Sequence, residues 1–340
     1  MKYFWESSWK DTDFYNTAFN KAEQLRNNIT KDHTVAIRKT FNLSEPGCNV
    51  NCEFCSLAQK YVNVWNNDKI IDNDCVSILD YSKNYPELTN LSNIELVLYR
   101  NGIEYDDIEY ARLRKYIELV KSMNYPLIGG DFGVISKKET IYDLKEAGLD
   151  YIHNNIETNG RLYPVVIGKN ERRMEKKMET LSLAYENGLD ITSGLLLGVG
   201  ENADDLIEEI CTMRELPAKR VNVNFMNCTN NERIGKIFSH ASRQHTPEYA
   251  IHSLVFVRNY IRNDQSLIVG CGINRYLSEN ISLLEKILRI ADTIHLGSFT
   301  NIEGNSKSHR NLMEFLKKVE YEIVGHEYFF DNYKSAYRIK

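Results

Sequence analysis

Three cysteines with the spacing C-x3-C-x2-C lie in one short segment, at Cys48, Cys52 and Cys55. Thiolates are the usual protein ligands of iron–sulfur clusters, and this spacing supplies three of them to one cluster. A four-iron cube has four metal corners, so three thiolates leave one iron open to bind and reduce a small molecule. The segment therefore indicates redox chemistry rather than a purely structural role.

Other uses of these cysteines fit the sequence less well. Disulfide frameworks belong to small chains in oxidising compartments, whereas this chain has 340 residues, seven cysteines and no apolar N-terminal run that resembles a signal peptide. A structural zinc site normally takes four ligands, often as two separated pairs. The nearest histidine, His33, precedes the segment and shows no such pairing. An iron–sulfur cluster is the preferred interpretation, and zinc is the remaining one.

The bulk composition excludes several classes of function. Charged residues make up 26% of the chain and hydrophobic residues 42%, which is an ordinary soluble profile. The formal net charge is −5 and no long basic block occurs, so we expect neither nucleic acid nor an anionic membrane as a partner. No stretch approaches the apolar length of a membrane span. We therefore expect a cytoplasmic protein, in an anaerobic or low-oxygen cell that suits an oxygen-sensitive cluster.

The elements that must position the cysteines follow a regular alternation of short apolar runs and longer amphipathic runs. Several helical runs end in a glycine just before the next apolar run, as α/β repeats commonly do. The predicted strands are 35–43, 94–99, 126–130, 151–156, 191–197, 221–226, 267–269 and 293–296. Predicted helices between them include 106–122, 137–147, 172–187, 203–214, 247–262 and 282–291.

Eight strands alternating with helices predict an α/β fold with a single (β/α)8 TIM-type barrel. The alternative is a doubly wound open sheet, because a local pattern does not report whether the sheet closes. The cysteine segment follows the first strand, at the carboxyl end where α/β proteins build their sites. We expect residues 1–34 to form a helical extension capping the barrel, residues 35–324 the barrel, and residues 325–340 a terminal tail or lid.

The cysteine spacing, with the aromatic Phe54 between the last two cysteines, resembles that of the radical S-adenosylmethionine (SAM) enzymes. The resemblance implies a [4Fe–4S] cluster whose open iron chelates SAM. It further implies that one electron from the reduced cluster breaks a carbon–sulfur bond, giving methionine and a 5′-deoxyadenosyl radical. That radical would abstract hydrogen from a small substrate in the barrel. Cofactors of this kind carry the difficult chemistry, while the protein orients and shields it.

Further segments narrow the resemblance to the biotin-synthase-like branch, which also contains an iron–iron hydrogenase maturase and methylornithine synthase. Residues 146–158 are similar to the fourth-strand region of biotin synthase, and residues 296–305 to its eighth-strand end. Residues 190–201 match the fifth-strand pattern G-x-[I/L]-x-G-x-x-E of radical SAM proteins. The resemblance covers roughly residues 14–324, nearly the whole chain.

The resemblance also assigns roles to individual residues. Those that it places around SAM are Phe54, Asn155, Glu157, Arg172, Ser193, Gly194 and Leu196. Four further residues are expected on the substrate side, either from the resemblance or from their position in the predicted barrel. They are His153, Asn224, Cys228 and Cys271. Each has a simpler interpretation. Arg172 lies in a charged run typical of a solvated helix, the polar strand-end residues can satisfy backbone groups, and the two cysteines can be small buried residues.

The chain departs from biotin synthase where that enzyme holds a second, sulfur-donating cluster with three cysteines and an arginine. Gly129, Thr192 and Ile273 stand at the alignable positions, so that auxiliary site is absent in its known form. Cys228 and Cys271 follow the sixth and seventh predicted strands, and a different auxiliary cluster or a persulfide at these cysteines remains an alternative. Cys75 and Cys211 lie in helical stretches and are interpreted as core or surface cysteines.

Three functions follow, in order of preference. The first is a one-cluster radical SAM enzyme in cofactor biosynthesis or metallocofactor maturation, with an electron donor such as ferredoxin or flavodoxin. The second is a sulfur-inserting synthase of the biotin or lipoyl type with an unconventional sulfur source. The third is a non-enzymatic iron–sulfur carrier, against which stand the 194–201 pattern and a chain long enough to enclose a substrate.

Overall fold

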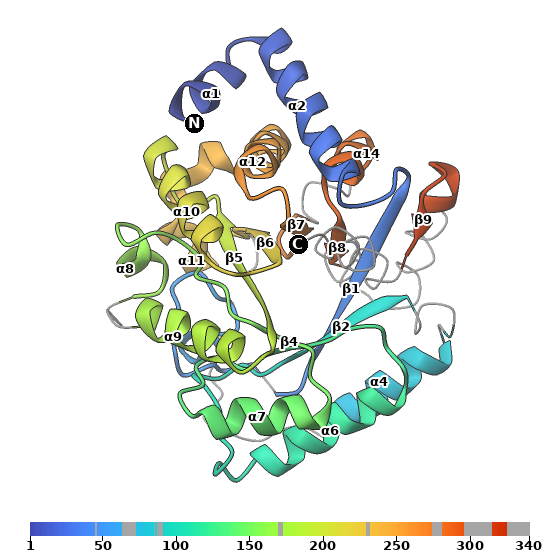
Figure 1. Ribbon diagram of the computed structural model, residues 1–340. Coiled ribbons are helices and arrows are strands. Elements are labelled where there is room, and N and C mark those ends of the chain that lie inside the picture. Colours follow the sequence, from blue (N-terminus) through green and yellow to red (C-terminus); the bar gives the residue numbers. More distant parts are fainter. Residues whose placement is uncertain are drawn as a thin grey trace.

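The computed structural model describes residues 1–44, 46–62, 73–84, 86, 91–168, 173–228, 232–273, 281–295 and 315–324. Parallel strands form a closed barrel at its centre (Figure 1). They are β1 (Thr34–Asn42), β2 (Ser92–Val97), β3 (Ile128–Asp131), β4 (Tyr151–His153), β5 (Asp190–Leu197), β6 (Arg220–Phe225), β7 (Ser266–Val269) and β8 (Thr293–His295). They pair in the order β2-β3-β4-β5-β6-β7-β8-β1, and β1 also pairs with β2. This closure confirms the predicted α/β barrel and shows that the open-sheet alternative is wrong.

Helices surround the barrel (Figure 1). Those in the described part of the chain are α1 (Lys2–Ser8), α2 (Thr12–Asn27), α3 (Gln59–Val62), α4 (Asn73–Asn84), α6 (Tyr110–Ser122), α7 (Lys138–Ala147), α8 (Tyr163–Val166), α9 (Arg173–Glu186), α10 (Ala203–Glu215), α11 (Glu232–Ile237), α12 (Pro247–Tyr260) and α14 (Ile281–Ile290), with a 3₁₀ turn at Ser239–Gln244. A short strand, β9 (Glu322–Ile323), pairs with the start of β1. Each predicted helix and strand is therefore present, with ends shifted by a few residues.

Local sequence signals explain where the helices start and stop. α7 ends at Gly148, whose φ of 111° lies in the left-handed region that glycine adopts without a steric penalty. At the start of α10, the Asn202 side chain accepts hydrogen bonds from the backbone of Asp204 and Asp205, and the Asp205 side chain accepts one from Asn202 N. This reciprocal capping box satisfies backbone groups that the first helical turn leaves unpaired. Such signals position the helix that follows β5.

The N-terminal helices pack on the outside of the barrel against α12 and α14 (Figure 1). Arg26 of α2 is fully buried, and its guanidinium donates to the carbonyl oxygens of Ala291 and Thr34. In return, Arg258 and Asn259 of α12 donate to carbonyl oxygens of α2. These helices therefore lie against the outer helix layer. The domain boundaries at residues 34 and 324 remain predictions.

The fourth strand is shorter than the sequence predicts. β4 ends at His153 because the chain then bends, and Glu157 adopts a left-handed φ of 76°. Glu157 N donates to Gly194 O, and Leu196 N donates to Glu157 O, so this residue stays attached to β5. Three predictions lie outside the described residues: Arg172, the 296–305 segment and the 325–340 tail.

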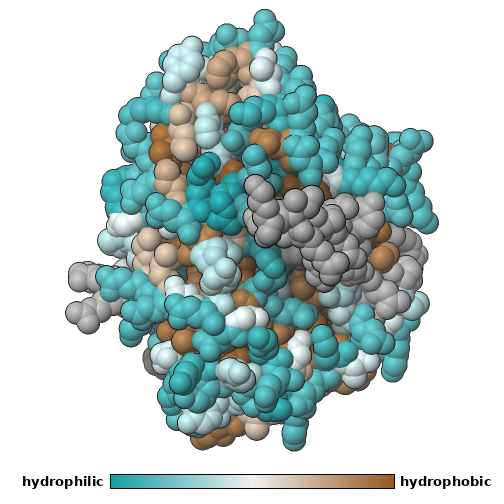
Figure 2. Space-filling model, in the orientation of Figure 1, coloured by the Kyte–Doolittle hydropathy of each residue, from teal (hydrophilic) through white to brown (hydrophobic). Residues whose placement is uncertain are grey.

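The visible surface is mainly hydrophilic, and hydrophobic residues occur on it in small groups (Figure 2). Within the described residues, no helix is both long and apolar enough to cross a membrane.

Candidate functional site

The cysteine segment leaves β1 at the carboxyl end of the barrel and folds back on itself. Cys48 N and Gly47 N donate to Leu57 O, and Gln59 N donates to Cys48 O, which closes the segment into a loop. Glu53 N donates to Val166 O, so α8 holds the outer side of this loop. We call residues 47–59 the cysteine loop. The fold thus places all three cysteines at one mouth of the barrel, where βα-loops build the sites of barrel proteins.

The three thiols are half-buried and interact electrostatically with one another. Burial raises the pKa of Cys52 to about 11 and that of Cys55 to about 12. The negative charges of Cys48 and Cys52 add to this rise in the pKa of Cys55. Such thiolates are stabilised by a metal, because coordination deprotonates a thiol outright. The donor set therefore fits a thiolate-bound metal cluster.

A single metal ion fits this donor set less well. In the described part of the chain, no three side chains among His, Cys, Asp and Glu converge as one ion requires. A cube differs, because each of its thiolates binds a different iron and the sulfur atoms stand further apart. The preference for a cluster over zinc thus stays a prediction from the cysteine spacing.

Two cations of α9 face the cysteine loop. Arg173 and Lys177 are buried, and their positive charges lower the pKa of Cys52, in opposition to burial. The Lys177 ammonium lies 3.5 Å from Glu157 Oε1 and donates to the carbonyl oxygen of Asn155. Arg173 donates to Asn101 Oδ1, while its Nε has no described partner although it is buried. α9 thus brings positive charge to the site from outside the barrel.

Asn155 and Glu157 lie together beside β5. Glu157 Oε2 is buried and has no hydrogen-bond partner among the described residues. The Oδ1 atom of Asn155 sits over Gly194, where a Cβ would approach it to 2.6 Å. A buried carboxylate oxygen without a donor is costly unless a ligand supplies one. This pair therefore fits the hydroxyl or ammonium groups of a bound ligand.

The barrel interior beneath this pair is polar rather than aliphatic. Glu95 Oε2 accepts from Arg38 Nη1 at 3.1 Å and from the Tyr151 hydroxyl at 3.2 Å, and it lies 2.8 Å from His153 Nδ1. Burial opposes ionisation of Glu95, but the charges of Arg38 and His153 outweigh it and hold the pKa of Glu95 below its usual range. Arg38 Nη2 also donates to Asn222 Oδ1 at 2.7 Å. Barrel interiors are usually filled by Val, Ile and Leu, so this buried polar network makes the interior a candidate for function.

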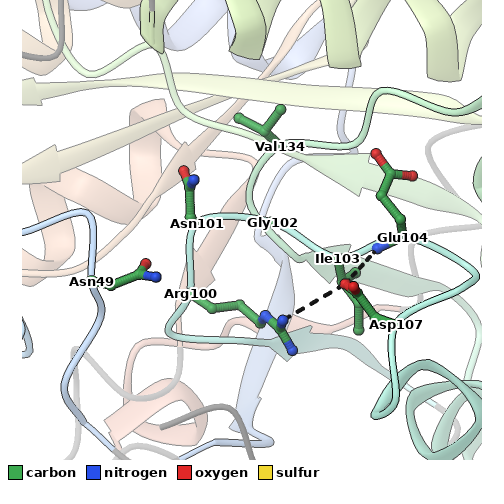
Figure 3. A pocket seen from close by; sticks show the side chains of 8 residues that line it. All are labelled: Asn49, Arg100, Asn101, Gly102, Ile103, Glu104, Asp107 and Val134. Carbon is green, nitrogen blue, oxygen red and sulfur yellow. Dashed lines mark hydrogen bonds and ion pairs between the residues drawn. The ribbon is translucent and has the colours of Figure 1, made fainter. Parts of the chain in front are cut away.

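A pocket of about 330 Å³ adjoins the cysteine loop (Figure 3). Asn49 of that loop lines it, together with Arg100 and Asn101 after β2 and Val134 after β3. In Figure 3 the Arg100 guanidinium points toward Asp107, 3.6 Å away. Asn101, which lines this pocket, also accepts a hydrogen bond from Arg173 of α9.

The remaining residues predicted around SAM divide into two groups. Phe54 and Leu196 meet in one apolar cluster with Cys52, so the structure brings them to the cysteine loop. The Ser193 side chain points to the opposite face of β5 from Gly194, because side chains alternate along a strand. Its hydroxyl donates to Asn154 O at 2.9 Å. Ser193 therefore reaches the site only through its backbone.

The residues predicted on the substrate side are dispersed. His153 lies in the polar interior described above. Asn224 Oδ1 accepts from Cys271 N at 2.7 Å, so this oxygen satisfies a backbone group, as the simpler interpretation predicts. Cys228 Sγ lies 3.8 Å from His245 Nε2, whereas the exposed Cys271 has its Sγ 3.8 Å from His295 Nδ1. Each cysteine thus contacts a different histidine.

The positions of the missing auxiliary cluster are filled by other side chains. A Cβ on Gly129 would meet the Tyr151 ring at 1.9 Å, and Thr192 Oγ1 accepts from Arg220 Nε at 2.8 Å. Aromatic and guanidinium groups therefore occupy this region of the barrel. Cys211 lies on α10, away from the barrel mouth, and the side chain of Cys75 lies outside the described residues.

Sequence reasoning missed Arg173, Lys177, Arg38 and Glu95. The charged run before residue 179 was interpreted as a solvated helix, yet Arg173, Lys177, Thr180, Leu181 and Ala184 form the buried stripe of α9. Arg173 and Lys177 are spaced at helical intervals from Leu181 and Ala184, and this spacing could have shown that they lie on the buried face. Arg38 and Glu95 each break an apolar strand, and a charge in a buried strand is a signal of the same kind.

Comparisons with known proteins agree with this geometry. A family model described as the radical SAM superfamily matches residues 44–212. The chain is 27% identical over 188 residues to biotin synthase of Clostridium botulinum, covering 53% of this chain and 54% of that enzyme. It is 28% identical over 210 residues to biotin synthase of Brucella canis, covering 60% of each. The chain thus matches little more than half the length of these curated relatives.

Solved structures share the fold. Methylornithine synthase superposes with a TM-score of 0.72 at 14% identity, covering 95% of this chain and 93% of that one. The FeFe-hydrogenase maturase HydG of Carboxydothermus hydrogenoformans gives a TM-score of 0.63 at 14% identity, covering 94% and 74%.

Proposed function

This chain belongs to the radical SAM superfamily, and we therefore propose that it is an enzyme that cleaves SAM reductively at a [4Fe–4S] cluster. The enzyme then removes a hydrogen atom from a small substrate held in the barrel. The observation that carries this proposal is the placement of three half-buried thiols in one loop at the barrel mouth, facing the buried cations of α9.

The residues present fit both groups. Cys48, Cys52 and Cys55 would hold the cluster, while Asn155 and Glu157 would hold SAM. The absence of a Cβ at Gly194 leaves room there, since one would clash with Asn222 O at 2.0 Å. When bound, the two groups supply one-electron cleavage of a carbon–sulfur bond and abstraction of a hydrogen atom.

The chain's own side chains have three tasks in this proposal. Apolar residues of the cysteine loop, among them Phe54, exclude water from the thiolates together with Leu196. Arg173 and Lys177 balance the negative charge of thiolates and carboxylates, and Arg172 remains a predicted contact of the SAM carboxylate. The enclosed polar interior orients a small substrate beneath SAM.

A reconstitution experiment tests the proposal. Protein loaded with iron and sulfide under anaerobic conditions should bind about four irons per chain, as one cube requires. With dithionite it should convert SAM to 5′-deoxyadenosine. Changing Cys48, Cys52 and Cys55 together to Ala should abolish both iron binding and the product. The variant Cys211→Ala, on α10, is the matched control and should keep both.

Other results would exclude the proposal or replace it. Four bound irons without SAM binding or 5′-deoxyadenosine would favour an iron–sulfur carrier. Cluster iron that persists in the triple variant would reveal a second cluster and favour sulfur insertion involving Cys228 and Cys271.

The proposed physiological role is argued by analogy with the same relatives. We place the enzyme in cofactor biosynthesis or metallocofactor maturation, with ferredoxin or flavodoxin as the electron donor. To identify the donor, purified ferredoxin or flavodoxin is added in its reduced form. The visible absorbance of the cluster then shows whether the cluster is reduced.

A further inference from the structure

We propose that Glu95 and His153 act as positioning residues that hold the Asn155 carboxamide in the one orientation that suits SAM. This inference rests on the proposed function. It concerns a chain of contacts that runs from the middle of the barrel, through β2 and β4, to the SAM-binding pair.

His153 connects a carboxylate to an amide. Its Nδ1 lies 2.8 Å from Glu95 Oε2, and its Nε2 lies 2.7 Å from Asn155 Oδ1. Glu95 and His153 are 3% exposed and Asn155 is 8% exposed, so water does not replace either contact. The His153 imidazole therefore connects Glu95 in the barrel interior to Asn155 at the barrel mouth.

Both ring nitrogens of His153 face acceptors, so both must carry a proton to make hydrogen bonds. Burial alone would lower the pKa of His153, but the Glu95 carboxylate raises it above its usual value. Arg38 opposes this rise and Asp131 supports it. His153 thus acts as a cationic donor toward the Asn155 oxygen.

The consequence is a defined polarity at the SAM-binding pair. Asn155 Oδ1 is engaged by His153, and its Nδ2 donates to no described residue, so it is available to a ligand. Glu157 Oε2 is an acceptor that lacks a donor among the described residues. One donor and one acceptor side by side match two neighbouring hydroxyl groups, such as the ribose diol of SAM.

The amide has little freedom to turn around. Gly194 lies against Asn155 Oδ1 on one side, and His153 lies on the other. Reversing the amide would place its NH₂ group against a protonated nitrogen, where no hydrogen bond forms. The cation on His153 therefore selects the orientation, and Glu95 maintains the cation.

The test measures SAM affinity rather than turnover. The reduced cluster of the reconstituted holoenzyme is titrated with SAM at about pH 8, and the change in its electron paramagnetic resonance spectrum gives Kd. His153→Leu cannot donate a hydrogen bond, whereas His153→Gln retains an amide donor. We expect Kd to rise about tenfold in His153→Leu, which corresponds to about 1.4 kcal/mol, and only about threefold in His153→Gln.

A double-mutant cycle separates positioning from packing. If His153 acts through Asn155, then in an Asn155→Ala background the Leu and Gln variants should have the same Kd. His252 lies on α12 outside the barrel, so His252→Leu and His252→Gln are matched controls and should change Kd less than twofold. Iron content verifies that each variant holds its cluster.

Glu95→Gln provides a second route if the His153 variants do not fold. It keeps the side-chain size, leaves His153 in place and removes the charge, so Kd should again rise severalfold. Wild-type protein that holds the cluster but ignores SAM would overturn both proposals. If the wild type binds SAM, either of two results would overturn the positioning role alone. The first is an unchanged Kd in Glu95→Gln. The second is that His153→Leu and His153→Gln still change Kd by different factors in the Asn155→Ala background.

Discussion

At the residue scale, the site depends on a few atoms that are present or missing at single positions. Gly194 is an example, because its missing Cβ makes room for the Asn155 amide and for the backbone of β6. The positive φ of Glu157 is another, since it turns the carboxylate toward Lys177 and away from a regular strand. Neither feature involves a reactive group, yet both determine where reactive groups lie.

Replacing Gly194 by Ala should therefore damage the site and the fold together. The new methyl group would lie 2.0 Å from Asn222 O, and overpacking of this kind typically costs about 1–3 kcal/mol. We expect a lower thermal midpoint and weaker SAM binding. Gly160→Ala is the matched control, because nothing lies within 4 Å of its added Cβ. Equal stability of the two variants would contradict the close approach of β6 to Gly194.

His252 provides a pH-dependent term in stability. Burial and the nearby Lys286 lower the pKa of His252 from 6.5 to about 4, and Glu248 only partly offsets this. The unfolded chain takes up the proton near pH 6.5, whereas the folded chain does not until about pH 4. The stabilising contribution is therefore complete above pH 6.5 and is lost as the pH falls toward 4.

His252→Gln should flatten this dependence. We expect the free energy of unfolding of the wild type to fall between pH 6.5 and 4 by on the order of 2 kcal/mol more than that of the variant. Urea unfolding at several pH values measures the difference. Parallel curves for the two proteins would show that His252 does not titrate as described.

At the element scale, α9 has an unusual buried face. Arg173 and Lys177 lie on the stripe that otherwise packs through Thr180, Leu181 and Ala184. The first two turns of this helix thus serve the site, and the later turns anchor it to the barrel. Because the helix is one rigid unit, packing at its far end determines where its cations lie relative to the cysteine loop.

Lys177→Ala should destabilise the protein by about 3 kcal/mol, because the buried Glu157 would lose its cation. Burial already raises the pKa of Glu157, and loss of Lys177 raises it further. The loss of stability in Lys177→Ala should therefore grow as the pH rises, since the unpaired Glu157 carboxylate must then ionise. Thermal unfolding at about pH 6 and pH 8 measures it. Lys176→Ala removes an exposed neighbour and should leave stability unchanged.

At the scale of the whole molecule, closure of the barrel brings distant segments to one mouth. The cysteine loop follows β1, Asn155 follows β4 and Gly194 lies on β5. The N-terminal helices then support the outer layer on the side of α12 and α14. Aromatic rings pack between these layers. The ring centroids of Phe4 and Trp5 lie 5.5 and 5.3 Å from that of Phe256.

Removing residues 1–27 should therefore prevent stable folding, although no predicted site residue is lost. The deletion leaves the buried Arg258 and Asn259 without their acceptors on α2 and exposes Phe256. We expect aggregation or a strongly lowered thermal midpoint, measured by light scattering during heating. Lys2→Ala removes only an exposed ion pair with Asp204 and should behave as the wild type. A soluble, cooperatively folding truncation would contradict this role.

The sequence by itself determined which cysteines share one loop and are the proposed cluster ligands, the alternation of strands and helices, and the strand that each candidate residue follows. These features depend on spacing and on local preferences, such as glycine at the end of α7, which act over a few residues. That is why the barrel class and the positions of Cys48, Cys52 and Cys55 could be predicted.

Only the tertiary structure decided which side chains meet. Lys177 and Glu157 are 20 positions apart, and Glu95 and His153 are 58 apart. Their contacts require a closed sheet with a set register, and the direction of Ser193 away from the site depends on strand alternation within that sheet. A pattern read along the chain contains none of these distances, because burial and charge pairing are properties of the packed barrel.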